Sequence, residues 1–291
     1  MELNDCNFSI QVDDSTDIVQ KSQYSTIIRY VNSQGKLVER FLVFHDVSCE
    51  RTAEALFTLV TSCLEKYDSK SKLVGQCYDG ASVMSEQLDG LQSKIKKVTP
   101  EAVFVQCLAH RLNLVLSQSY NSISKCRIFF ANVNGLPSFF FHHLAKRTHA
   151  ADVILNKRIP TSVVTRWSSN SKILSLIHNN WNSLKQVFID ILNDPNSNKA
   201  SIRQSQGYLN MFNGFEFVLL VIIFNEFFSI SDVLFDVLQK RSLDINYCVS
   251  QIKNAQNQLN TKRSEVIFAN IIDSVSLRTE LPTEHRDGRI R

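Results

Sequence analysis

The hydrophobic pattern of this chain changes near residue 108, and this change constrains the fold more than any other feature. Before it, short segments alternate apolar and polar residues or are rich in β-branched and aromatic residues, which predicts strands with helices between them. After it, the strand patterns mostly stop and apolar residues recur at helical spacing. The sequence therefore predicts an α/β module followed by an all-helical region.

The first part predicts the order strand, strand, strand, helix, strand, helix, strand. Strands are expected at 8–13, 24–31, 36–45, 73–78 and 103–107, and helices at 53–67 and 81–98. Gly35 ends a short turn between the second and third strands, which predicts an antiparallel hairpin. This order is the layout of a ribonuclease H-like fold. Beyond it, helices are expected at 108–119, 173–193, 207–238 and 246–259.

The composition excludes several classes of protein. The seven cysteines are scattered without a CxxC pair, which indicates reduced thiols rather than a disulfide framework or a four-ligand zinc module. The N-terminal residues lack the pattern of a signal peptide. The longest apolar run, 217–224, has eight residues, so it predicts a buried helix and no membrane span. A net charge of +4 permits contact with nucleic acid without predicting it.

Two acidic residues stand at the ends of predicted strands. Asp13 ends the first strand and Asp79 follows the fourth, and these strands lie side by side in the predicted layout. Carboxylates meeting there could hold Mg²⁺, which prefers oxygen ligands, for cleavage or transfer of a phosphodiester. Gly80 would let the chain turn tightly beside them. The alternatives are that Asp79 is a turn residue and that 13–17 is a polar loop with turn or helix-capping chemistry.

Four segments, in order, carry a family resemblance: FSIQVDDSTDIVQKSQYSTIIRYV, CYDGASVMSEQLDGLQSKI, CLAHRLNLVL and TRWSSNSK. They resemble the transposase domain of hAT-superfamily elements, in the lineage of zinc finger MYM-type protein 1-like, TTF-type and DUF4371 domain proteins. The resemblance implies an α/β, ribonuclease H-like core interrupted after its fifth strand by a large all-helical insertion. It also implies a triad of two aspartates and a glutamate, and a C-terminal dimerisation region.

The resemblance assigns roles to six residues. Asp13 and Asp79 match the first two acids, so they would be the catalytic and metal-binding residues for Mg²⁺. His110 matches a family histidine near the DNA end, and Arg166-Trp167 match an Arg-Trp pair in the insertion. With Arg111, these residues could contact a phosphate or an unpaired base. The alternatives are a helix-start histidine packed on the sheet and a tryptophan buried at a helix junction.

The chain departs from the family pattern at the third acid. The expected S-x-x-S-E-R-x-F-S motif is absent, and Glu226 reads as a helix-face residue. We therefore expect a fold whose C-terminal part is missing, with a partial core at 1–115, a helical region at 116–278 and a polar, disordered tail at 279–291. The family's dimerisation region would be absent too.

These departures shape the functional prediction. We expect a transposase-derived domain, ancestrally active in Mg²⁺-dependent DNA cleavage and strand transfer, that is catalytically incomplete in this chain. Mg²⁺ is the implied cofactor, if it is still bound. Cys107 and His110 have zinc-like spacing without a matching second pair, so no zinc is expected. Both DNA and other proteins are expected as candidate partners. The family resemblance implies a nuclear location, and the alternative is the cytoplasm. The alternatives are a fragment of an active transposase and a domesticated nuclear protein-interaction module.

Overall fold

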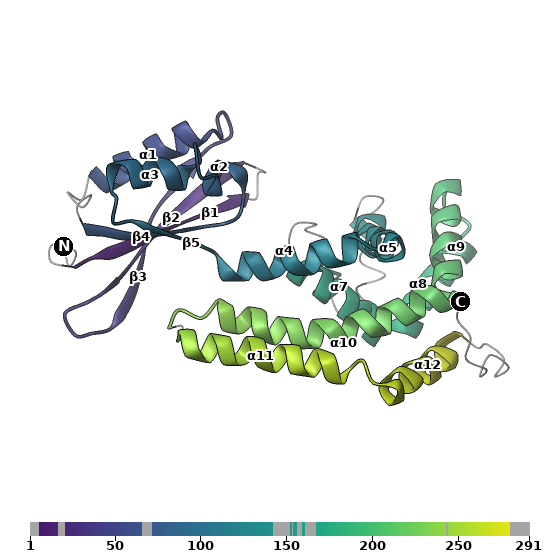
Figure 1. Ribbon diagram of the computed structural model, residues 1–291. Helices are drawn as coiled ribbons and strands as arrows, with labels where there is room; N and C mark the ends of the chain where they lie inside the picture. Colours follow the sequence, from purple (N-terminus) through teal and green to yellow (C-terminus); the bar gives the residue numbers. More distant parts are fainter. Residues whose placement is uncertain are drawn as a thin grey trace. The chain divides into compact units, whose positions relative to one another are not determined.

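The computed structural model describes residues 6–16, 21–65, 72–141, 152, 154–155, 159–160, 167–242 and 244–279. The chain divides into two compact units, drawn in Figure 1. The first comprises Met1–Leu114 and Leu238–Leu243, and the second comprises Val115–Val237 and Asp244–Arg291. Each unit has its own cluster of buried hydrophobic side chains. The predicted tail at 279–291 falls, apart from Thr279, outside the described residues.

A five-stranded mixed sheet forms the centre of the first unit (Figure 1). Its strands are β1 (Phe8–Thr16), β2 (Ser22–Val31), β3 (Leu37–Asp46), β4 (Leu73–Tyr78) and β5 (Val103–Gln106). They are ordered β3-β2-β1-β4-β5 across the sheet. The first three pair antiparallel, whereas β4 runs parallel to β1 and β5 runs parallel to β4. The predicted α/β architecture with an antiparallel meander is therefore confirmed.

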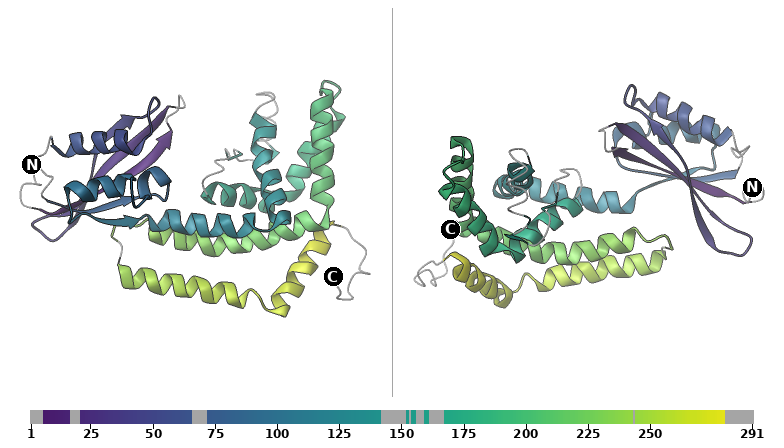
Figure 2. Two further views of the ribbon diagram at one scale, coloured as in Figure 1. Left: turned by 45° about the horizontal axis from the view of Figure 1, so that its top comes forward. Right: turned by 180° about the vertical axis from the view of Figure 1, so that it is seen from behind.

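Three helices lie on one face of this sheet: α1 (Ala53–Glu65), α2 (Ser82–Ser85) and α3 (Leu91–Val98) (Figure 2). Side chains alternate between the faces of a strand, so every second residue of β1 meets these helices. Phe8, Ile10 and Val12 are at most 3% exposed. They belong to one core with Leu56 of α1 and Leu91 of α3. Burial of each such side chain stabilises the unit by roughly 1.5–3 kcal/mol.

The other face of the sheet, called the open face below, exposes apolar side chains. Phe41 and Phe44 of β3 are 53% and 55% exposed, and their ring centroids are 4.7 Å apart. Residues three apart would point to opposite faces of a regular strand. A shift in the β2–β3 register between Thr26 and Ile27 marks a β-bulge, which brings both rings to one face. Val103 and Val105 of β5 are also exposed.

The described residues of the second unit form helices and the segments between them, without strands. Helix α4 (Leu108–Asn121) begins in the first unit and ends in the second. The others are α5 (Ser124–Phe141), α7 (Trp167–Asn179), α8 (Trp181–Asn193), α9 (Lys199–Asn213), α10 (Phe215–Leu238), α11 (Ile245–Thr261) and α12 (Glu265–Thr279). Phenylalanine rings from several of them form the core. Phe129 of α5 stacks on Phe224 of α10, with centroids 5.5 Å apart, and Phe188 of α8 meets Phe212 of α9 at the same centroid distance.

Three predicted helices are each divided in two, which corrects the sequence interpretation. The helix expected at 81–98 is interrupted between α2 and α3. A Cβ atom on Gly90 would lie 2.6 Å from the backbone of Glu86, so glycine permits this tight segment. The helix expected at 173–193 breaks at Asn180, and that expected at 207–238 breaks at Gly214, which has extended backbone angles.

Two helices were not expected from the sequence. Helix α5 contains Gly135 and Pro137, which both disfavour a helix interior. It forms because its apolar face, including Phe130, Val133 and Phe140, is buried in the core of the second unit. Tertiary packing supplies most helix stability in proteins, so burial outweighs the local propensity. Helix α12 buries only Val275 fully, and its sequence pattern is correspondingly weak.

Helix α10 is long and apolar enough to cross a membrane by length and composition. The sequence analysis considered only the run of eight apolar residues, which is too short to span a membrane. The helix itself has 24 residues and extends well beyond that run. Half of its most apolar window is buried inside the structure. Phe217, Val221 and Phe228 are among the side chains that it contributes to the core of the second unit. These contacts are those of a core helix, as predicted.

Candidate functional site

The two acids of the sequence hypothesis lie at the ends of neighbouring parallel strands. β1 and β4 pair with Gln11 opposite Cys77, and the same register carried two residues further sets Asp13 level with Asp79. The side chain of Asp13 is exposed, and that of Asp79 is partly exposed. Residues 13–16 continue β1 rather than forming the polar loop that was the alternative. The carboxyl ends of β1 and β4 therefore present two carboxylates at one edge of the sheet.

Asp13 lies on the open face of the sheet, because its neighbour Val12 is buried on the helix-covered face. The charge of Asp13 reaches the thiol of Cys77 on β4. Burial raises the pKa of Cys77 to about 11, the negative charges of Cys107 and Asp13 add to this rise, and Arg29 opposes it. A thiol with so high a pKa is protonated at neutral pH and is a poor metal ligand. The carboxylate oxygens, rather than the Cys77 thiol, are therefore the candidate metal ligands at the carboxyl ends of β1 and β4.

Asp14, which follows on the helix-covered side, makes an ion pair that sequence reasoning missed. Both of its carboxylate oxygens accept hydrogen bonds from Nη2 of Arg51, at 3.0 and 2.9 Å. The Arg51 guanidinium lies 5.9 Å from the ring centroid of Tyr24. Burial raises the pKa of Tyr24, and the charges of Asp14 and, more weakly, Asp79 contribute. Asp14 is thus held by an arginine that is far away in sequence, which no local pattern indicates.

Asp79 also has the turn role that was its alternative. Its Oδ1 atom accepts a hydrogen bond from the backbone N–H of Ala81 at 3.0 Å. Gly80 follows Asp79 in this turn without a positive φ, since among the described glycines only Gly35 has one. A Cβ atom on Gly80 would lie 2.2 Å from Nε2 of Gln106, the far end of a flexible side chain. One carboxylate oxygen of Asp79 therefore shapes the turn.

His110 and Arg111 lie in the first turn of α4, directly after β5. The backbone N–H of Cys107 donates to the carbonyl of Tyr78 at 2.8 Å and ties the ends of β5 and β4 together. Because β1, β4 and β5 are parallel, their carboxyl ends lie at the same edge of the sheet. His110 is half-buried and Arg111 is exposed. Both residues thus lie at the carboxyl end of the parallel strands, the same end that carries Asp13 and Asp79.

The carboxylates of Asp13 and Asp79 supply two oxygen ligands of the kind that a hard divalent cation prefers. Two carboxylates with coordinating waters are a usual set for Mg²⁺, which is often bound by one or two protein carboxylates. No third histidine, cysteine, aspartate or glutamate joins them, since the described part of the chain has no group of three such residues able to hold a metal. Glu226 lies on α10 in the second unit and makes an ion pair with Lys262.

Comparison with known families finds a match at this end of the chain. Residues 1–90 match the family described as DUF4371: ZMYM1/FAM200, RNase-like domain. The matched stretch contains both Asp13 and Asp79. The predicted resemblance to DUF4371 and zinc finger MYM-type protein 1-like proteins is confirmed over these residues, and the family's RNase-like description agrees with the mixed α/β unit. An hAT transposase origin stays a prediction.

Two curated relatives align with nearly the whole chain. The human protein named 52 kDa repressor of the inhibitor of the protein kinase is 19% identical over 274 residues, which cover 89% of this chain and 36% of that protein. Its mouse counterpart is 21% identical over 280 residues, with the same coverage. The chain thus spans just over a third of the length of these relatives. The similarity extends through the helical region, beyond the family match.

The structure does not describe the side chains of the Arg166-Trp167 pair. Arg166 lies outside the described residues. Trp167 is the first residue of α7, and the position of its side chain is likewise outside them. The structure therefore brings Asp13, Asp79, His110 and Arg111 to one sheet edge and leaves the roles of the other two as predictions.

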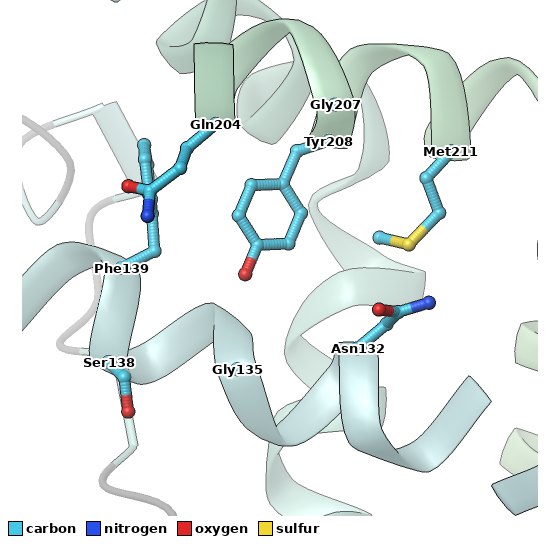
Figure 3. Close-up of a pocket in the computed structure, with 8 residues that line it drawn as sticks. All are labelled: Asn132, Gly135, Ser138, Phe139, Gln204, Gly207, Tyr208 and Met211. Carbon is cyan, nitrogen blue, oxygen red and sulfur yellow. The ribbon is translucent and has the colours of Figure 1, made fainter. Parts of the chain in front are cut away.

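The second unit has a hollow of about 730 Å³ between α5 and α9 (Figure 3). Tyr208 projects from α9 toward α5, and Asn132 and Gln204 lie at opposite ends of the hollow (Figure 3). Gly135 and Gly207 leave space along the facing helices. The described residues that line the hollow are apolar or uncharged polar ones.

Proposed function

We propose that this chain is a transposase-derived domain with a ribonuclease H-like core, whose first unit keeps a two-carboxylate site for Mg²⁺. The observation that carries the proposal is the register of β1 and β4, which sets Asp13 level with Asp79 at the carboxyl edge of the sheet. The match of residues 1–90 to an RNase-like family supports it. Asp13 and Asp79 would hold the metal, and Arg51 would keep Asp14 in its ion pair beside them.

Mg²⁺ at this edge would polarise a phosphodiester and activate a water or a 3′-hydroxyl. The chain's own contribution is two carboxylates, whereas the ancestral chemistry needs a third acid. Because no third carboxylate joins Asp13 and Asp79 within the residues that the structure describes, we propose that this chain alone does not cleave DNA. Nicking of supercoiled plasmid by the purified protein with Mn²⁺, abolished by Asp79→Ala, would contradict this.

The proposed DNA contacts lie beside the carboxylates and in the helical region. His110 and Arg111 start α4 at the same strand edge, where Arg111 is exposed and able to contact a phosphate. Arg166 and Trp167 are proposed to contact DNA from the second unit. We propose a nuclear location, which imaging of a tagged chain would test.

A second candidate is a protein-interaction module without DNA chemistry. The curated relatives are named as repressors of a protein kinase inhibitor, and their similarity covers the helices as well as the sheet. On this hypothesis the helical unit would bind protein partners and the acids would be relics. A third candidate is a fragment of an active transposase whose third acid lies in sequence outside this chain. Retention of the cellular role by Asp13→Asn and Asp79→Asn variants would favour the interaction module.

Calorimetric titration with Mg²⁺ and Mn²⁺ tests the proposal. We expect saturable binding to the wild-type chain and its loss in the Asp13→Asn/Asp79→Asn double variant, which keeps side-chain size and removes two negative charges. The matched control is Glu86→Gln/Glu101→Gln, which removes two exposed carboxylates from the same unit. This control should bind as the wild type does. Equal, negligible binding by all three proteins would refute the metal site.

A further inference from the structure

A second hollow, of about 670 Å³, lies in the first unit between α3 and the edge strand β5. Its volume is within the range of about 300–1,000 Å³ usual for ligand pockets. Phe104 and Gln106 of β5 line it, together with Lys96 and Lys97 of α3. These two strand residues share a face with Tyr78 of β4, because Gln106 pairs with Tyr78 in the sheet. The hollow therefore adjoins the strand end that leads into Asp79.

The lysines of α3 divide into two groups. Lys94 is committed to ion pairs with Glu54 and Asp89, each at 2.7 Å. Lys96 and Lys97 are exposed, and they line the hollow together with polar and aromatic side chains; no carboxylate is among the described residues that line it. Lys97 also contributes to the lowered pKa of Asp89, behind the larger effect of Lys94. Two adjacent cations in such a hollow attract an anionic ligand.

The rest of the lining suits an unpaired nucleobase. The Phe104 ring is half-buried and lies 5.9 Å, centroid to centroid, from the ring of Tyr78, tilted by 34°. An aromatic side chain in a positively charged groove is the usual platform for a base of a single strand. The carboxamides of Gln87 and Gln106 can donate to and accept from a base edge. A base within a duplex, stacked on both sides, has no face for such a ring.

We propose that this hollow binds one nucleotide of a single-stranded nucleic acid, with its phosphate at Lys96 and Lys97 and its base at Phe104. The Oγ of Ser85, which also lines the hollow, donates to the carbonyl of Gly80 at 3.1 Å and links the hollow to the turn after Asp79. The inference deepens the proposed function by placing a nucleic-acid strand next to the turn that follows Asp79, on the helix-covered side of the sheet. Binding of the strand does not need the metal, so the nucleotide-binding hollow and the Mg²⁺ site can be refuted independently.

The test is fluorescence anisotropy of a labelled 12-nucleotide single-stranded DNA with the whole chain in EDTA. We expect Lys96→Gln/Lys97→Gln to weaken binding about tenfold or more, and to reduce the slope of log K against log salt by about 0.7, for the one phosphate that the two lysines contact. Phe104→Leu should weaken binding by roughly fivefold or more without changing the salt slope. The control Lys199→Gln/Lys253→Gln removes the same charge from exposed sites of the second unit and should bind within about twofold of the wild type.

Each other outcome overturns the inference. Absence of binding by the wild type, or equal weakening in the control pair, would mean that the hollow is not a specific site. Duplex DNA binding as tightly as the single strand would exclude the unpaired base, and a free mononucleotide that competes at the same concentration as unlabelled strand would identify a nucleotide rather than a strand as the ligand. Thermal melting checks that Phe104→Leu still folds. Asp13→Asn/Asp79→Asn should keep strand binding in EDTA, and Lys96→Gln/Lys97→Gln should keep the metal titration.

Discussion

Tyr208 projects from α9 toward α5 and lines the hollow between them (Figure 3). Burial raises its pKa to about 12, against about 10 for an exposed tyrosine. Between these values the unfolded chain has lost this phenolic proton while the folded chain still holds it. A rise in pH across this interval therefore favours the unfolded state. Below pH 10 both states are protonated, and Tyr208 adds no pH dependence.

We expect Tyr208→Phe to reduce the loss of unfolding free energy between pH 10 and pH 12. Urea unfolding followed by circular dichroism at several alkaline pH values measures this dependence. Tyr247→Phe, a change at an exposed tyrosine of α11, is the matched control and should retain the wild-type dependence. Identical pH dependence in the Tyr208→Phe variant and the wild type would show that the Tyr208 hydroxyl is not protected from ionisation.

At the scale of elements, glycines in two helical segments have opposite roles. Gly207 lies within α9, and a Cβ atom there would meet nothing within 4 Å. Gly90 precedes α3, where a Cβ atom would lie 2.6 Å from backbone atoms of Glu86. Glycine within a helix is less stable than alanine by roughly 0.5–1 kcal/mol. Glycine at position 207 therefore lowers the stability of the protein, whereas the close backbone at position 90 requires glycine.

Gly207→Ala should therefore raise the free energy of unfolding by about 0.5–1 kcal/mol. Gly90→Ala should lower it by about 1–3 kcal/mol, because backbone must shift to admit the methyl group. Chemical denaturation of both variants beside the wild type measures the two changes. If both shifted in the same direction, the distinction between an open helical glycine and a close backbone approach would be wrong.

The whole molecule has two hydrophobic cores, one in each compact unit. Ile10 of β1 and Phe188 of α8 are both fully buried, and each belongs to a different core. Truncation of a buried side chain removes contacts and leaves a cavity, so its effect falls on the unit that contains it. Stability can then be measured unit by unit.

Ile10→Ala should destabilise the first unit by about 2–5 kcal/mol, and Phe188→Ala the second by about 3–5 kcal/mol. In differential scanning calorimetry we expect two transitions, each variant lowering the midpoint of a different one. A single transition that both substitutions lower equally would show that the units unfold as one.

Local sequence patterns predicted the strand and helix order of the first unit and the candidate acids. Strand patterns depend on alternation over a few residues, and a turn with Gly35 predicts the hairpin locally. The layout then predicted that the strands ending near Asp13 and Asp79 would be neighbours. The helical region was harder, because helical spacing continues across Asn180 and Gly214, while Pro137 argues against a helix that core packing stabilises.

Which side chains meet depends on tertiary packing. Asp14 is bound by Arg51 from 37 residues away, so the acid next to the proposed ligand is already paired. Lys96 and Lys97 lie in the last turn of α3, where basic residues are ordinary partners of the helix dipole, but β5 packs beside them and adds Phe104 to form a hollow. Such contacts depend on how distant segments pack, and local sequence patterns carry no information about the distance between them.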